Sequence, residues 1–244
     1  MSAATVATVP ARGTIPGPVS RVARLHLVAW PVAMLWPWGI LGLSFAMNLL
    51  IWGTVSQADE GWTGGLMSIY VVQFIGYVQT YTRGFPFALG MSVTRRAYYA
   101  GTWLYAALEA VAFSTVLLAL KLVEDATGGW GVSLEFFGVP PVGQDDALLQ
   151  WLVYVVPFLF GAALGACWGL VMERWGYNGL LTIMAGIIVV LGVAVVVVSR
   201  GGWWQELGHW FADQSTAAML AAWPLVPIAV LAVIGYAVIR RATP

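Results

Sequence analysis

The sequence predicts an all-α polytopic membrane protein with six transmembrane helices and both termini in the cytoplasm. Three observations support this fold class. The chain of 244 residues is 60% hydrophobic and only 9% charged, whereas an ordinary soluble domain carries about 25% charged residues. Six stretches of 22 to 32 residues lie between successive ionisable groups, and a transmembrane helix needs roughly 20 apolar residues. The basic residues also gather on one side of these stretches.

The predicted spans follow the six stretches in order. A backbone in lipid must satisfy its own hydrogen bonds, so each stretch is expected to form a helix. Only the third stretch is interrupted, by Glu109 and Lys121. The spans are expected at residues 35–55, 62–82, 98–120, 148–171, 177–198 and 218–239, within one transmembrane domain of residues 34–244.

The segment before the first span is predicted to lie outside the bilayer core. Residues 1–18 are rich in Ala, Thr, Pro and Gly and lack the apolar core of a secretory signal peptide. They are expected to form a disordered cytoplasmic tail. In residues 19–33 basic side chains stand among apolar ones, which favours a short helix lying in the membrane interface.

The distribution of basic residues sets the predicted orientation. Cytoplasmic loops carry an excess of Lys and Arg. Nine of the eleven basic residues fall on the side that bears the termini, and only Lys121 and Arg200 fall on the other. Both termini of this multi-pass membrane protein are therefore expected in the cytoplasm.

Composition also excludes several functions. A net charge of zero gives no field that would gather nucleic acid. One cysteine, Cys167, permits no intramolecular disulfide and no CxxC motif. His26 and His209 fall on opposite sides of the membrane, so they cannot share a metal. The sequence contains no Walker-type loop and no dinucleotide fingerprint. We predict no catalytic residue, no metal site and no cofactor bound by this chain, so energy must come from a partner or a gradient.

One ionisable residue, Glu109, lies deep in a predicted span. A carboxyl group at that depth is costly to bury and marks either a function or a specific polar contact. Gln73 in the second span and Asn48 in the first lie at similar depth and are its expected partners. Two interpretations remain: a neutral acid that holds helices together through Gln73, or a group used in transport.

Small residues on the fourth span predict a close helix contact. Gly161, Gly165 and Gly169 recur every four residues and so share one helical face. Three small residues on one face let two backbones approach closely in a membrane. The partner helix belongs either to this chain or to another subunit.

Two loops on the outer side differ in pattern. Residues 123–147 contain several Gly and Pro residues, which indicates turns. Residues 201–216 carry aromatic residues at helical spacing against polar ones, which predicts a short amphipathic helix at the outer end of the bundle.

The cytoplasmic loop of residues 83–96 has the pattern of a short helix. Pro86 suits a first helical turn, Gly90 suits a helix end, and Thr94 suits the N-cap of the third span. The helix is expected to expose apolar side chains between arginines. It is either a turn whose arginines obey the topology rule or a docking site for a cytoplasmic protein. The residues assigned to such docking are Phe85, Phe87, Leu89, Met91, Arg95 and Arg96.

At this loop the sequence resembles permease subunits of ABC-2 type ATP-binding-cassette transporters, especially actinobacterial members. The segments RGFPFALGMSVTRRAYYAGT and GGWGVSLEFFGVP are similar to that family. The resemblance implies the permease architecture of type V exporters, with six spans, an N-terminal interfacial helix, and a coupling helix in the first cytoplasmic loop.

The resemblance also implies a function and partners. Such a permease exports or extrudes a hydrophobic or amphiphilic compound. A separate ATPase, present in two copies, binds ATP and Mg²⁺, and a second permease, identical or a paralogue, completes the pathway in the bilayer. Two other classes stay open: a secondary carrier that uses Glu109 as its proton site, and a membrane scaffold that transports nothing.

Overall fold

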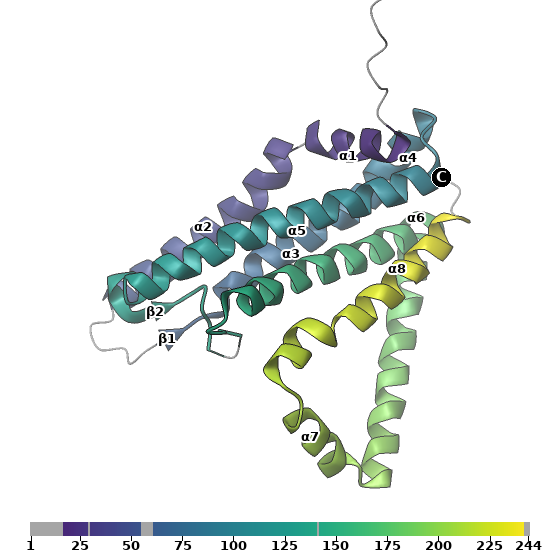
Figure 1. Ribbon diagram of the computed structural model, residues 1–244. Coiled ribbons are helices and arrows are strands. Elements are labelled where there is room, and N and C mark those ends of the chain that lie inside the picture. Colours follow the sequence, from purple (N-terminus) through teal and green to yellow (C-terminus); the bar gives the residue numbers. More distant parts are fainter. Residues whose placement is uncertain (1–16, 29, 55–60, 141, 242–244) are drawn as a thin grey trace, which may run out of the picture.

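The computed structural model describes residues 17–28, 30–54, 61–140 and 142–241 and shows a protein built of helices (Figure 1). In chain order the elements are α1 Pro18–Val28, α2 Trp30–Thr54, β1 Gly61–Trp62, η1 Gly64–Leu66, α3 Met67–Gln79, η2 Thr80–Gly84, α4 Phe85–Gly90, α5 Arg95–Ala126, η3 Gly129–Ser133, β2 Leu134–Glu135, α6 Ala147–Gly201, α7 Trp204–Ala212, η4 Ala218–Ala222 and α8 Leu225–Ile239.

Four helices in the described part of the chain are long and apolar enough to cross a membrane. They are Ala33–Thr54, Arg95–Ala126, Ala147–Gly201 and Ala218–Ile239. The prediction of an all-helical membrane protein is therefore confirmed. The helix of Arg95–Ala126 extends beyond the predicted third span at both ends.

A single glycine bends the longest helix. α6 has 55 residues, and at 1.5 Å per residue it is about 80 Å long, more than twice the thickness of a bilayer core. Gly176 has φ +66° and ψ −168°, a conformation that residues with a Cβ rarely adopt. Figure 1 shows that α6 turns sharply along its length. We call residues 147–175 the first limb and residues 177–201 the second limb.

The chain from α3 to α4 is helical without a break. The π-helical segment η2 follows α3 directly, and α4 follows η2. Pro86 stands in the first turn of α4, and the Thr94 hydroxyl accepts a hydrogen bond from the backbone N–H of Ala97 at 3.3 Å. The short helix and the N-cap are thus present as predicted. The difference is that α4 continues the preceding helix, whereas a separate helix in a loop was expected.

The N-terminal part differs from the prediction in its bounds. The helix expected over residues 19–33 ends at Val28, and residues from Trp30 onwards already belong to α2. Of the tail predicted for residues 1–18, residues 1–16 lie outside the described part of the chain. α1 packs along α5.

The ends of several elements meet at one end of the molecule. Figure 1 shows α1, α4, the start of α5, the bend of α6 and the end of α8 close together there. Arg95 donates a hydrogen bond from Nη1 to the backbone carbonyl of Arg240 at 3.3 Å, which joins α5 to the end of α8. Arg83 lies in η2 just before α4, and Arg174 lies in α6 just before its bend, so both belong to this end of the molecule. We call this region the arginine end.

The second limb and α7 stand apart from the other helices (Figure 1). Every residue from 181 to 197 is exposed, although nearly all are apolar. α7 provides the amphipathic helix predicted within residues 201–216. In a membrane protein, lipid or another chain faces such a surface.

Candidate functional site

A cavity of about 690 Å³ lies between the N-terminal helices and the run from α3 to α4. Along that run its lining begins at Val72 and ends at Phe87. Fifteen helical residues correspond to about 22 Å. The cavity therefore extends from the middle of the bundle to the arginine end, where Arg83 lines it.

The wall of the cavity is mostly apolar. Trp36 and Ile40 of α2 and Ile75 of α3 belong to this wall. Its polar groups come from α1, α3, η2 and α5. A largely apolar cavity with a few polar groups at defined positions suits a small hydrophobic or amphiphilic molecule.

Glu109 is the acidic residue that lines this cavity, and its carboxylate accepts three hydrogen bonds. Tyr77 donates to Oε2 at 2.8 Å, Tyr105 donates to Oε1 at 3.0 Å, and the Gln73 amide donates to Oε2 at 3.3 Å. The Gln73 amide also donates to the backbone carbonyl of Phe158. Both carboxylate oxygens thus have partners, and helices α3, α5 and α6 meet at this group.

Helical spacing explains why these side chains converge. Tyr105 and Glu109 are four residues apart on α5, and Gln73 and Tyr77 are four residues apart on α3. Residues at that spacing share one helical face. Gln73 was predicted as the partner of Glu109, whereas Tyr77 and Tyr105 were missed. The four-residue spacing was a signal that would have identified both.

Asn48 does not join this group. Its amide donates to the carbonyl of Ser44 on its own helix at 2.8 Å. The prediction that Asn48 is a partner of Glu109 is therefore wrong. A matching depth in two spans does not fix which way each side chain faces.

His26 closes the cavity near the arginine end. Its Nε2 lies 3.0 Å from Thr102 Oγ1, and its ring packs against Tyr98 and Tyr105 with centroids 5.9 and 5.2 Å away. Burial lowers the pKa of His26 to about 4, because the charged form loses hydration. His26 is therefore neutral at pH 7. The sequence analysis gave it no role in a site.

The predicted docking residues divide into buried and exposed groups. Phe87 and Met91 are exposed, at 62% and 47% of their surface. Phe85 is fully buried and packs on Tyr98 with ring centroids 5.5 Å apart. Leu89 is half-buried against the same core. Phe85 thus holds α4 in place and is not available for docking, which corrects its assignment.

The two arginines of that set also differ. Arg95 is held by the Arg240 carbonyl, whereas Arg96 is exposed. Because the first turn of α5 is fixed by the Thr94 cap, both guanidinium groups project from a rigid helix start.

The glycine face of α6 packs against the run of α3 and η2. A Cβ at Gly165 would lie 2.7 Å from Tyr77 Cβ and 2.9 Å from the Phe74 carbonyl oxygen, and a Cβ at Gly169 would lie 2.7 Å from Tyr81 Cβ. The predicted close contact is confirmed, and it is made within the chain. Gly161 belongs to it as well, because a Cβ there would lie 2.8 Å from Gln73 Oε1.

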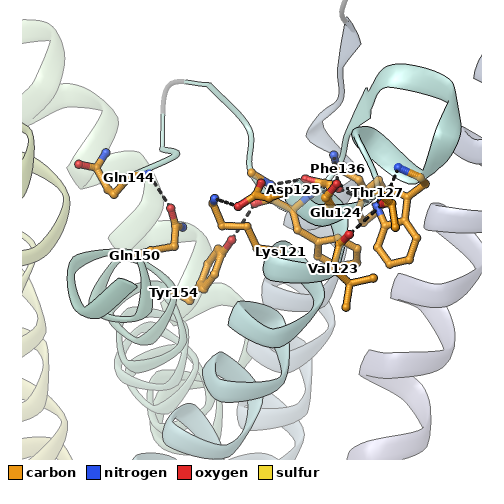
Figure 2. A network of polar contacts seen from close by, with 12 residues as sticks. Lys121, Val123, Glu124, Asp125, Thr127, Phe136, Gln144, Gln150 and Tyr154 are labelled. Carbon is orange, nitrogen blue, oxygen red and sulfur yellow. Dashed lines mark hydrogen bonds and ion pairs between the residues drawn. The ribbon is translucent and has the colours of Figure 1, made fainter. Parts of the chain in front are cut away.

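At the opposite end of α5, Glu124 organises the loop that was predicted to lie on the outer side (Figure 2). Its carboxylate is buried and accepts hydrogen bonds from the backbone N–H groups of Phe136, Phe137 and Gly138 at 2.7 to 3.1 Å. The indole N–H of Trp130 donates to it as well, at 2.9 Å. The sequence analysis predicted only turns for this loop.

Further contacts hold the same loop. Tyr154 of α6 donates to the carbonyl of Phe137 at 2.8 Å. Strand β2 pairs in parallel with β1, which brings the first and second predicted outer connections together. Lys121 and Asp125 form an ion pair at 2.6 Å, which lies beside Glu124 (Figure 2). The pairing of β1 with β2 depends on tertiary contacts and left no local pattern in the sequence.

No group of three or more His, Cys, Asp or Glu residues that could hold a metal ion occurs within the described ranges. The sequence matches no protein-family model, and the comparisons with curated proteins and with solved structures find no match.

Proposed function

We propose that this chain is the permease subunit of an ABC-2 type ATP-binding-cassette exporter, which moves a hydrophobic or amphiphilic compound across a bacterial cell membrane. In this proposal the six spans comprise α2, the run from η1 to η2, α5, the two limbs of α6, and η4 with α8. The arginine end faces the cytoplasm, as the topology rule for basic residues favours.

The observation that carries the proposal is the form of α4. It lies at the arginine end and presents Phe87 and Met91 outward, while Phe85 anchors it in the core. Water is a poor environment for two large apolar side chains, and a groove on a partner protein is a better one. Arg96 beside them adds attraction to an acidic rim.

The helical run gives α4 a mechanical connection to the cavity. A push on Phe87 acts on a helix that continues through η2 into α3, where Gln73 and Tyr77 line the cavity. Tyr98 strengthens this connection, because its hydroxyl donates to the Thr80 carbonyl at 2.7 Å. A rigid element of this kind can transmit a rigid-body displacement from a partner to a substrate site.

The remaining parts follow from the proposed class. Two copies of a separate ATPase would bind ATP and Mg²⁺ and engage α4. A second permease, identical or a paralogue, would complete the pathway. The apolar cavity with Glu109 at its deep end is the proposed substrate site, since it offers room for a hydrocarbon body and hydrogen-bonding groups for a polar end.

The test replaces the exposed side chain of Phe87 in α4 and that of Met91, which directly follows α4. The variant Phe87→Ser with Met91→Ser should insert and fold normally, because neither residue belongs to the core. It should lose binding of the ATPase and substrate-stimulated ATP hydrolysis. The matched control is Leu207→Ser with Phe211→Ser on α7, which also removes two exposed apolar side chains but at the other end. If the α4 variant recruits the ATPase and transports as well as the control does, the docking assignment is wrong.

A proton-coupled carrier is the second candidate, and the position of Glu109 in the cavity lining favours it. The variant Glu109→Gln distinguishes the two. In the proposed exporter it should retain transport, because an amide oxygen still accepts from Tyr77 and the amide N–H₂ can donate to the Tyr105 hydroxyl. A stable Glu109→Gln protein without transport would favour the carrier.

A further inference from the structure

A second cavity lies at the arginine end, between the bend of α6 and the end of α8. Its volume is about 530 Å³. Arg174 and Trp175 line it from the first limb, and Arg240 and Arg241 line it from the end of α8. Three arginines, one from the first limb and two from the end of α8, therefore line one partly open cavity.

These guanidinium groups have no acidic partner among the described residues. Among the described residues, the ion pair is that of Lys121 with Asp125, and it lies at the other end of α5. Glu173 precedes Arg174 in the sequence, but it does not line the cavity and forms no ion pair with a described residue. The cavity is thus positively charged, and no acidic side chain in the described part of the chain pairs with its arginines.

Aromatic rings hold two of the three groups. The Arg174 guanidinium lies 4.5 Å from the centre of the Trp175 ring, and that of Arg240 lies 5.8 Å from the centre of the Tyr236 ring. A guanidinium that stacks on a ring keeps its N–H edge free for hydrogen bonds. A phosphate group is the anion that this planar fork matches.

The helix dipoles do not account for the charge. The first limb and α8 both end here, and each helix C-terminus is equivalent to roughly half a negative charge. Two such ends offset about one of the three guanidinium charges, and the N-terminus of the second limb adds about half a positive charge, so at least two positive charges remain. A ligand with a negatively charged phosphate group would balance this remaining positive charge.

The apolar part of the cavity identifies what carries the phosphate. Ile234, Ala237 and Val238 of α8 form the remaining wall, and the exposed apolar second limb begins directly beside it at residue 177. A free phosphate ion would make no use of this wall. A lipid would, because its headgroup lies at the depth of the helix ends and its acyl chains extend along the apolar helices.

We propose that this cavity binds the headgroup phosphate of an anionic glycerophospholipid from the leaflet at the arginine end. A zwitterionic headgroup fits less well, since its ammonium group would approach the guanidinium groups. The site is separate from the cavity that contains Glu109, and it requires no ATPase.

The experiment measures lipid binding to the purified full chain in detergent by native mass spectrometry. The probes are phosphatidylglycerol, phosphatidylcholine and inorganic phosphate. The variant Arg174→Gln with Arg240→Gln removes two charges from the cavity. The control Arg21→Gln with Arg24→Gln removes two exposed charges on α1. Each arginine near an anionic lipid surface contributes about a fivefold change in affinity, so the cavity variant should bind phosphatidylglycerol roughly 25-fold more weakly.

The proposal expects the original chain and the control to retain phosphatidylglycerol, and to prefer it over phosphatidylcholine. An equal loss in both variants would show bulk attraction to the basic face and would overturn the site. Binding of inorganic phosphate as strong as that of the lipid would overturn the lipid assignment. Should the double variant fail to fold, the single variant Arg241→Gln, at an exposed position, should show the same preference for phosphatidylglycerol weakened about fivefold.

Discussion

Glu124 is the residue on which the order of the outer loop depends. Four N–H groups converge on its carboxylate, three of them from consecutive backbone positions. The variant Glu124→Gln places an amide N–H₂ against donors, so at least one buried N–H loses its acceptor. A hydrogen bond to a charged group contributes about 1.5 to 3 kcal/mol, and a loss of about this size is expected. Thermal unfolding in detergent measures it.

Asp125→Asn is the control for that variant. Asp125 also accepts a hydrogen bond, but it is exposed and pairs only with Lys121 in the described structure. An exposed pair of this kind contributes about 0.5 kcal/mol. If both variants lower the unfolding temperature equally, the carboxylate of Glu124 does not hold the loop.

The roles of the two buried carboxyl groups, those of Glu109 and Glu124, were not equally predictable from the sequence. Glu109 was recognisable because a charged residue within a span is rare, and its contact with Gln73 followed from depth. Glu124 lies in the predicted loop of residues 123–147, where an acidic residue is unremarkable. Its partners are backbone N–H groups of residues 136–138, and backbone groups leave no side-chain pattern in a sequence.

At the scale of elements, the contact between α6 and α3 is the one that glycine makes possible. Gly165→Leu should destabilise the protein strongly, because its Cβ would overlap Tyr77 and the backbone of Phe74. Gly192→Leu is the matched control on the same helix, since no atom lies within 4 Å of a Cβ there. Fluorescence-detected size-exclusion chromatography after heating compares the two. Equal survival of both variants would contradict the close approach of the two helices.

Other elements were predictable only in part. Charge spacing located the apolar helices, since the energetic cost of a charge in lipid acts along the whole chain. It did not predict that η2 would join α3 to α4 without a loop, because helix continuity there depends on how α4 packs: Phe85 is buried against Tyr98. The docking prediction for Phe85 was wrong for the same reason.

The whole molecule has its helix ends gathered at the arginine end and the second limb with α7 separated from the other helices (Figure 1). This arrangement brings both cavities and α4 to the same end. The orientation in the membrane therefore decides whether α4 can meet a cytoplasmic partner.

Two serines on either side of α5 test that orientation. Ser92 precedes the helix and Ser133 follows it, and the 32 residues of α5 are about 48 Å long. Both serines are exposed and both have positive φ, so each is a matched control for the other. In a Cys167→Ala background, Ser133→Cys should react with a membrane-impermeant thiol reagent in intact cells. Ser92→Cys should react only after the membrane is opened. The reverse pattern would place α4 outside the cell, where no ATPase could reach Phe87 and Met91.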